Sequence, residues 1–323
     1  HPRRFAAVPR VLKAQIMIPI RYLDCSALMR ELLGDRAQAA GIELFEGDPN
    51  EAELARLLAD AEIVLDGHTT LTAQHIAAAP RLRSIIFLGS GPGSYIDMAA
   101  AERAGVAVHR IANYGDRAIA EHAFALLLAA ARDVARMDRE IRDGVWSSAE
   151  GVELGGKRLG VLGLGGIGRE MVRIASGFGM EVVAWSRSGV DPSLPCRALP
   201  LEEVLATSDA LSLHLALAPQ TRGLIDAAAL ARVKPGALLV NTARGALVDE
   251  AALAGALRSG RIRHAALDVF DVEPLPGASP LAGLANVTFT AHAAYKTREA
   301  SARLLVAALD LVAAERRRLE RRP

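Results

Sequence analysis

The chain has 323 residues, 51% hydrophobic and 23% charged, which is more than one ordinary core needs, so we expect two domains. Its 38 basic and 37 acidic residues leave a net charge of +1, which excludes a global field that attracts nucleic acid or membrane. No apolar run reaches the roughly 18 residues of a membrane span. Cys25 and Cys196 lack metal-ligand or disulfide spacing, so we expect no metal and a reducing, cytoplasmic setting.

In the N-terminal third, short apolar runs of strand type alternate with helical stretches such as residues 51–59. The runs cover residues 15–19, 42–45, 63–65, 84–88 and 106–108. This alternation predicts βα repeats and a small parallel sheet. The fourth run leads into Gly89-Ser90-Gly91-Pro92-Gly93, whose bare backbone amides can accept an anion, although glycine loops also simply turn a chain.

Two long segments have helical periodicity outside these repeats. Residues 118–142 are rich in alanine and predict one long helix, whose small side chains would let another helix approach closely. Residues 297–319 predict a second helix with a basic end. Glutamates are interleaved in that basic end, so we interpret it as a solvated helix end rather than a nucleic-acid site.

A glycine turn lies in the context of a dinucleotide site. Residues 158–162 predict a buried strand, Gly163-Leu164-Gly165-Gly166-Ile167-Gly168 the turn, residues 169–178 a helix and residues 181–185 the next strand. The first glycine allows the tight turn, the second a close approach to a pyrophosphate, and the third close packing of helix and strand. The sequence therefore predicts that a dinucleotide binds at Gly163, Gly165, Gly166, Ile167 and Gly168.

The end of the second strand of this unit bears on the choice of cofactor. An NAD site usually has Asp or Glu there, about 20 residues after the glycines. This chain has Ser186-Arg187-Ser188, in which the guanidinium can pair with a 2′-phosphate and the hydroxyls can donate to it. We therefore expect a preference for NADP(H), with NAD(H) still usable; alternatively, Arg187 stacks on adenine or points to solvent.

Three polar residues each follow a further apolar run of strand type. Arg244 comes after residues 237–240, Glu273 after residues 264–267, and His292 after residues 287–289. Residues beyond the carboxyl ends of parallel strands gather in one crevice, where ligands bind. Each residue alone is compatible with a surface cation, a turn residue or a loop histidine. Together they predict a cation, a carboxylate and an imidazole at one substrate.

These features resemble the D-isomer-specific 2-hydroxyacid dehydrogenases over most of residues 80–300. The collinear matches are Ala120-Glu121-His122, the glycine turn, Ser208-Asp209 with His214, Thr221-Arg222-Gly223, Asn241-Thr242-Ala243-Arg244-Gly245, Leu267-Asp268-Val269-Phe270 with Glu273-Pro274, and Thr290-Ala291-His292. The resemblance implies an α/β fold with two doubly wound parallel-sheet domains. A Rossmann nucleotide-binding domain, residues 113–294, would be inserted into a flavodoxin-like substrate domain, residues 1–112 and 295–323.

The resemblance also implies roles that these side chains can fulfil. Arg244 would grip the substrate carboxylate and carbonyl, and His292 would donate a proton to the carbonyl oxygen or remove it from the hydroxyl. Glu273 would hydrogen-bond the imidazole and favour its acid form. The other implied contacts are Ser90 and Gly91 with the substrate carboxylate, Thr242, Ala243 and Asp268 with the nicotinamide carboxamide, and His214 and Thr221 beside the cofactor.

The chain departs from the family pattern near the substrate. The segment from Gly89 to Asp97 is one residue longer than usual and lacks an aspartate, while Ala291 and Ala293 replace a proline and a branched residue. These changes leave the identity of the substrate open. His68, His75, His109 and His122 lack ligand spacing, and we interpret them as structural or surface histidines.

The sequence therefore predicts an oxidoreductase that transfers hydride between NADP(H) and a small 2-keto or D-2-hydroxy acid of the glyoxylate or hydroxypyruvate type. We expect a homodimer through the helix at residues 118–142, and neither nucleic-acid nor membrane partners. Two alternatives remain open: a formate- or phosphite-type dehydrogenase of the same fold, and an NAD(H)-sensing, corepressor-like interaction protein. Turnover of formate or phosphite would favour the first alternative. No turnover of any acid in a panel of keto acids would favour the second.

Overall fold

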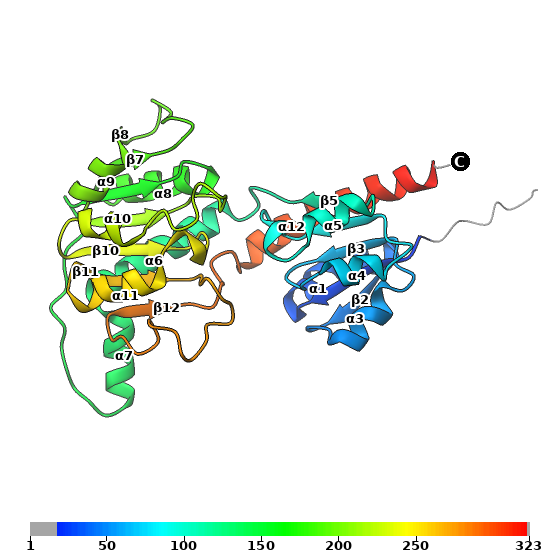
Figure 1. Cartoon of the computed structure of the whole chain (residues 1–323), viewed down its shortest axis with the longest axis horizontal. Coiled ribbons are helices and arrows are strands. Elements are labelled where there is room, and N and C mark those ends of the chain that lie inside the picture. Colours follow the sequence, from blue (N-terminus) through cyan, green and yellow to red (C-terminus); the bar gives the residue numbers. More distant parts are fainter. Residues whose placement is uncertain (1–17, 322–323) are drawn as a thin grey trace, which may run out of the picture. The chain divides into compact units, whose positions relative to one another are not determined.

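The computed structural model describes residues 18–321, which fall into two compact units (Figure 1). Unit 1 comprises the residues up to Ala112 together with those from Ala302 onward, and unit 2 is Asn113–Ser301. The second boundary lies inside the last helix, whereas the sequence placed it just before that helix. None of the helices between residues 18 and 321 is long and apolar enough to cross a membrane.

Unit 1 contains a five-stranded parallel sheet in the order β2-β1-β3-β4-β5. The strands are β1 (Ile20–Cys25), β2 (Ile42–Glu46), β3 (Ile63–Asp66), β4 (Ser84–Phe87) and β5 (Ala107–Arg110). β3 and β4 are buried along their whole length and apolar except for Asp66 and Ser84 at their ends, because helices cover both faces of the sheet. This is the doubly wound order of flavodoxin-like domains.

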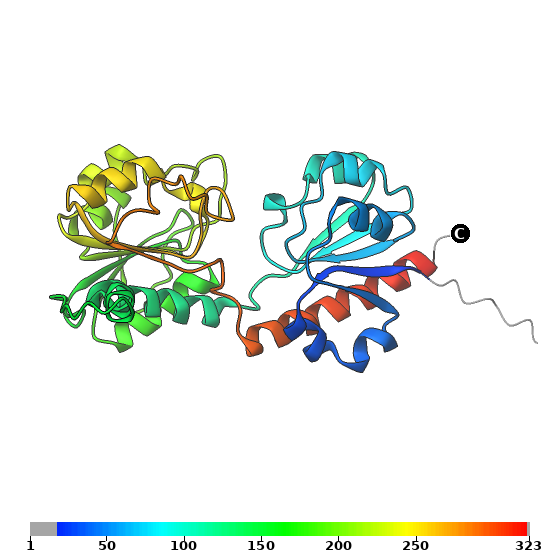
Figure 2. The ribbon, with the colours of Figure 1, turned by 90° about the horizontal axis from the view of Figure 1, so that it is seen from below.

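The helices of unit 1 lie on the two faces of this sheet (Figure 2). They are α1 (Ala27–Leu33), α2 (Asp35–Ala39), α3 (Glu51–Leu58), α4 (Ala73–Ala77), α5 (Met98–Arg103) and α12 (Arg298–Glu320), with a 3-10 turn, η1 (Pro92–Ser94). Leucines of α3, Ile76 of α4 and alanines of α5 pack into one core with β3 and β4. α1 and α12 cover the opposite face.

One strand of unit 1 was predicted in the wrong place. The expected run at residues 15–19 precedes the strand, which begins at Ile20; residues 15–17 lie outside the described part. Pro19 has no N–H to donate to a ladder, so it can only accept, and its carbonyl receives the Glu62 and Ile63 amides. The other four runs match β2 to β5 to within two residues at each end.

Unit 2 contains a seven-stranded parallel sheet in the order β12-β11-β10-β9-β6-β7-β8. The strands are β6 (Arg158–Leu162), β7 (Glu181–Trp185), β8 (Arg197–Ala198), β9 (Ala210–Leu213), β10 (Ala237–Asn241), β11 (Ile262–Leu267) and β12 (Val287–Phe289). From β6 outward the order reverses between β6 and β9. This is the Rossmann switch point, where ligands bind at the carboxyl ends of the strands.

Helices pack on both faces of the second sheet and form a separate core on each (Figure 2). They are α6 (Asp116–Arg132), α7 (Val134–Arg142), α8 (Gly166–Gly177), α9 (Leu201–Thr207), α10 (Ala227–Arg232) and α11 (Glu250–Arg258), with a 3-10 turn, η2 (Gly245–Leu247). α6 and α8 lie on one face and α9, α10 and α11 on the other. Both sheets are thus parallel and have helices on both faces, as predicted.

The single long helix predicted for residues 118–142 is two helices. α6 ends at Arg132, and α7 begins at Val134 after Asp133, which has the left-handed backbone φ 54°, ψ 33°. Asp133 can hold this conformation because its carboxylate meets His264 Nδ1 at 3.0 Å and Arg136 at 3.5 Å. The break turns α7 away from the α6 axis.

Candidate active site

The strand-turn-helix segment at β6 and α8 leaves room for an anion at the end of α8. Gly163 has φ 99°, and a Cβ on Gly168 would overlap the Gly163 carbonyl oxygen, so these two glycines close the turn. A Cβ on Gly165 would meet nothing within 4 Å. Gly165 is also the N-cap of α8 and offers no side-chain cap, so the first amides of the helix are available to phosphate.

The residues after β7 form an exposed polar loop. Ser186 Oγ and Ser188 Oγ lie 3.1 Å apart, and the Arg187 side chain between them is exposed. The loop is tied to the first turn of α8 by an ion pair of 2.7 Å between Arg169 and Asp191. Two hydroxyls and a guanidinium therefore stand together at the strand end where a Rossmann fold receives the adenosine ribose.

Three further predicted cofactor residues lie at the ends of β9 and β10 or just after them. Burial lowers the pKa of His214 to about 4, so its imidazole is neutral near pH 7, and its Nε2 lies 2.8 Å from Ser212 Oγ. Its Nδ1 and the Thr242 Oγ1 are buried and lack a hydrogen-bond partner among the described residues. Thr221 Oγ1 instead holds its own loop, accepting from Ala218 N at 2.8 Å. Orphaned polar atoms beside an anion-binding helix end fit a nucleotide.

Glu273 and His292 are brought together as predicted. The Nδ1 atom of His292 lies 2.7 Å from Glu273 Oε2, and the Phe270 amide donates to Glu273 Oε1 at 2.9 Å. This leaves His292 Nε2 as the nitrogen that can exchange a proton with a ligand. Both side chains are 30% exposed, so the imidazole is held and still accessible.

Arg244 lies in the same unit, on the loop that follows β10. The Asn241 side chain shapes this loop: its Oδ1 accepts from Ala243 N at 3.0 Å and its Nδ2 donates to Arg244 O at 2.9 Å. A Cβ on Gly245 would overlap the backbone of Phe270, so only glycine lets the Arg244 loop approach the segment that carries Glu273. The guanidinium also donates to Ala243 O at 2.6 Å.

The charges in this cluster stabilise one another. Burial by itself would raise the pKa of Glu273, but the hydrogen bonds from His292 and the Phe270 amide, with the charges of His292 and Arg244, outweigh it and lower that pKa. Glu273 is therefore a carboxylate at neutral pH. This carboxylate accepts the hydrogen bond at Nδ1 and fixes the orientation of the imidazole, as a positioned acid or base requires.

A buried carboxylate holds the His292 loop. Asp268 accepts from Ala293 N at 2.9 Å, Ala294 N at 3.0 Å and Thr290 Oγ1 at 2.5 Å, and its carbonyl accepts from the His292 amide. These bonds keep His292 at the left-handed φ of 48°. Asp268 was predicted to contact the nicotinamide carboxamide. In the structure its side chain is fully buried and accepts hydrogen bonds from the His292 loop.

His122 belongs to the same network. Its Nε2 lies 3.0 Å from Thr290 Oγ1 and 3.6 Å from Asp268 Oδ1. Helix α6 therefore contributes a contact that stabilises the His292 loop. His122 was interpreted from the sequence as a structural or surface histidine, and its contact with Thr290 is a structural one. The available signal was its place in the matching Ala120-Glu121-His122 segment, but a contact across 168 residues of chain cannot be read from spacing.

Comparison with known proteins decides the family. Residues 124–294 match the family model of the D-isomer specific 2-hydroxyacid dehydrogenase, NAD binding domain. The glyoxylate reductase of Aeropyrum pernix is 42% identical over 251 residues, covering 74% of this chain and 75% of that protein. The chain belongs to the D-isomer-specific 2-hydroxyacid dehydrogenases.

Other members of the family bear other names. The D-3-phosphoglycerate dehydrogenase of Mycobacterium leprae is 40% identical over 282 residues, which cover 84% of this chain. The chain spans about half, 51%, of that relative's length. The solved structure of an acyclic imino acid reductase, Bsp5, in complex with NADPH and D-Arg has a TM-score of 0.80 at 29% identity and covers 92% of this chain and 98% of its own. Family membership is thus clear, while the substrate differs among relatives.

The remaining predicted residues lie in unit 1. Ser90 and Gly91 follow β4, and Gly91 precedes η1, where Ser94 N donates to the Gly91 carbonyl. Arg244, Glu273, His292 and the glycine turn all belong to unit 2. Each unit therefore presents its predicted residues at the carboxyl ends of its own strands.

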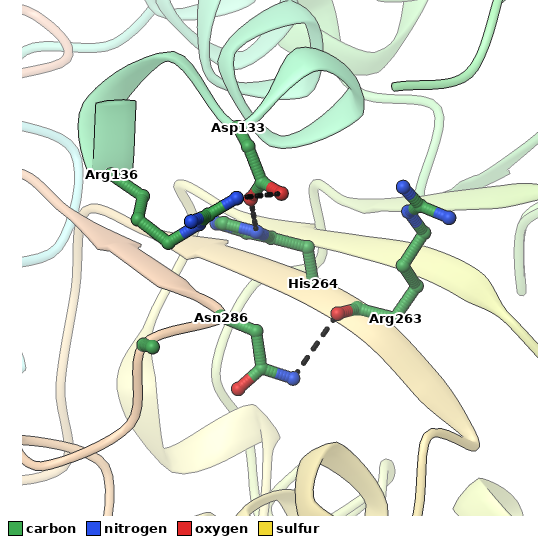
Figure 3. Close-up of a pocket in the computed structure, with 6 residues that line it drawn as sticks. Asp133, Arg136, Arg263, His264 and Asn286 are labelled. Atoms are coloured by element: carbon green, nitrogen blue, oxygen red, sulfur yellow. Dashed lines mark hydrogen bonds and ion pairs between the residues drawn. The ribbon is translucent and has the colours of Figure 1, made fainter. Parts of the chain in front are cut away.

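A cavity of about 160 Å³ in unit 2 is not the predicted site. It is lined by Asp133, Arg136, Arg263, His264, Ala285 and Asn286 (Figure 3). Asp133 lies at the break between α6 and α7, Arg136 is on α7, and the others lie at or before the amino ends of β11 and β12, opposite the ends that carry Glu273 and His292. Its polar groups also bond one another, as His264 does with Asp133, so it holds no unpaired catalytic group.

Proposed function

We propose that this chain is an NADP(H)-preferring reductase of small 2-keto acids, of the glyoxylate or hydroxypyruvate type, that forms D-2-hydroxy acids. The observation that carries the proposal is the 2.7 Å bond between His292 Nδ1 and Glu273, with Arg244 on the neighbouring strand end. Unit 2 would serve as the nucleotide-binding domain, with its cofactor residues at the glycine turn, β7 and β10. Unit 1 would be the substrate domain, with Ser90 and Gly91 as anion donors.

The reaction follows from the chemistry of the side chains. When bound, the reduced nicotinamide supplies a hydride, which goes to the carbonyl carbon of the keto acid. Arg244 binds the substrate carboxylate and carbonyl oxygen through its fixed fork of donors. His292 gives the Nε2 proton to the carbonyl oxygen, which completes the hydroxyl group. Glu273 holds the opposite ring nitrogen, Nδ1, and keeps the imidazole oriented during the transfer.

The sequence around the Ser90 loop favours a substrate without a phosphate group, although phosphoglycerate dehydrogenases are among the relatives. Residues 84–102 contain neither lysine nor arginine. A phosphate dianion is usually held by such cations, so this loop suits a smaller anion.

A substrate panel run with both NADPH and NADH tests the proposal. With glyoxylate or hydroxypyruvate as substrate, kcat/KM should be higher for NADPH than for NADH. Formate, phosphite and 3-phosphoglycerate should give little turnover with either cofactor. Arg187→Ala should lower kcat/KM for NADPH by about 10- to 100-fold, because a charge-assisted hydrogen bond is lost, and change that for NADH little. Arg232→Ala, an exposed arginine on α10, is the control. Equal or better use of NADH by the unchanged protein would contradict the NADP(H) preference.

The homodimer is proposed through α7 and the segment after it. Val134 and Ile141 on α7 are 51% and 53% exposed, and Val145 and Trp146 beyond it 52% and 90%. An apolar row of this kind is typical of a surface that a partner covers. Light scattering should give the mass of two chains, and a monomer at micromolar concentration would count against the dimer.

A further inference from the structure

The carboxylate of Asp116 lies against the first residue of α8. Asp116 is the first residue of α6, and a Cβ on Gly166 would overlap its Oδ2 atom. Such an overlap means that the carboxylate occupies the space in which any other residue at position 166 would place its side chain. α6 and α8 pack along each other, so the helix pair fixes this contact.

Position 166 is also part of the turn assigned to the cofactor pyrophosphate. Gly165 caps α8 without a side chain, and the amides of the first turn are the groups that an incoming phosphate would bind. A carboxylate beside this helix end would be a second anion next to the bound phosphate. If both are charged, they repel each other across a short distance.

Neighbouring charges do not neutralise Asp116. Glu170 on α8 and Tyr114 before α6 interact with its charge, and the cations that pair with Glu170 are Arg117 and Arg173. Arg117 bonds Glu121 at 2.6 Å and Glu170 at 3.2 Å, and Arg173 bonds Glu170 at 2.5 Å. Both cations are thus engaged by the glutamates, and Glu170 adds negative charge near Asp116.

The environment favours the protonated form of Asp116. Burial, and then the charge of Glu170, raise the pKa of this carboxyl above its ordinary value. A protonated carboxyl is neutral and carries an O–H that can donate to a phosphate oxygen. The same side chain is therefore a hydrogen-bond donor in its acid form and a repelling anion in its base form.

We propose that Asp116 is a proton-linked binding residue for the cofactor pyrophosphate, which admits the phosphates in its protonated form and opposes them as a carboxylate. This inference rests on the proposed nucleotide site. Binding then takes up a proton at Asp116 whenever the free protein has lost it. Affinity should accordingly be highest below the pKa of Asp116 in the free protein and fall as pH rises through it.

Calorimetric titration with ADP-ribose tests the proposal from about pH 5 to about pH 8. ADP-ribose has the pyrophosphate but neither a nicotinamide nor a 2′-phosphate, so neither the His292 cluster nor a titrating phosphate monoester contributes. The dissociation constant should rise about tenfold over this range, as for a linked pKa change of one unit. Titrations in buffers of different ionisation enthalpy should reveal proton uptake.

Variants separate Asp116 from its surroundings. Asp116→Asn and Asp116→Ser should bind ADP-ribose with no pH dependence and no proton uptake, and the affinity of the asparagine variant at pH 8 should match the low-pH limit of the unchanged protein. Glu170→Gln should move the same curve to lower pH. Glu202→Gln, an exposed carboxylate on α9, is the control and should leave it in place.

The outcomes distinguish this inference from the function on which it rests. An unchanged protein that binds ADP-ribose with a flat pH profile, or an Asp116→Asn variant that keeps the original slope, overturns the role of Asp116 alone. A protein that binds neither ADP-ribose nor NADPH overturns the nucleotide site itself. Adenosine, which has no phosphate, should bind without pH dependence in every variant.

Discussion

At the scale of single residues, His292 is the group on which the proposed chemistry depends most directly. It is held through Nδ1 by Glu273 at 2.7 Å and through its backbone by Asp268. His292→Ala removes the proton donor and leaves the glycine turn, which is predicted to bind the cofactor, unchanged. We expect kcat to fall by about 100- to 10,000-fold, the usual contribution of a positioned acid or base.

The dissociation constant of NADPH, measured by fluorescence, should stay within about threefold in His292→Ala, because a ring at the carbonyl oxygen adds little to cofactor binding. His75→Gln is the matched control: this histidine lies on α4 in unit 1 and bonds Glu51 at 2.9 Å. A His292→Ala variant that retains turnover would remove His292 from the mechanism.

At the scale of elements, the strand-turn-helix of β6 and α8 separates glycines that serve folding from those that serve binding. Gly168→Ala would force a methyl group into the Gly163 carbonyl, so it should lower the free energy of unfolding by about 1–3 kcal/mol. Gly165→Ala meets nothing within 4 Å, and its backbone, φ −69°, suits alanine. It should fold normally.

The methyl group of Gly165→Ala would nevertheless stand where the pyrophosphate approaches, so the dissociation constant of NADPH should rise at least about tenfold. Thermal midpoints and cofactor titrations of the two variants test this pair. Unimpaired NADPH binding by a folded Gly165→Ala protein would show that phosphate does not approach Gly165.

The elements that form the site were predictable because their signals are local. Buried parallel strands are continuous apolar runs, and the glycine turn has fixed spacing, so Glu273 and His292 could be placed at strand ends from the sequence. The break at Asp133 was not predictable, because apolar periodicity continues through it and the contact that stabilises it comes from His264, 131 residues away. The contact of the Asp116 carboxylate with Gly166 was not predictable for the same reason, because it depends on how α6 and α8 pack.

At the scale of the whole molecule, stability should depend on pH through buried histidines of unit 2. Burial lowers the pKa of His214 to about 4 in the folded chain, against roughly 6.5 in an unfolded one. The unfolded chain therefore binds the proton first as pH falls. The contribution of His214 to stability is complete above about pH 6.5 and is lost as pH falls toward about 4.

Between about pH 7.5 and about pH 5, this group should cost unit 2 about 2 kcal/mol of unfolding free energy. Both tryptophans of the chain, Trp146 and Trp185, lie in unit 2, so tryptophan fluorescence during urea unfolding reports this unit alone. His264, whose pKa burial also lowers, adds a loss of the same sign.

The test is thus the difference between the unchanged protein and His214→Gln, whose stability should fall about 2 kcal/mol less over this range. Glu273 and Asp268, whose pKa values lie below the usual carboxyl range, do not titrate in this window, so an equal loss in both proteins would assign the acid sensitivity of unit 2 to groups other than His214.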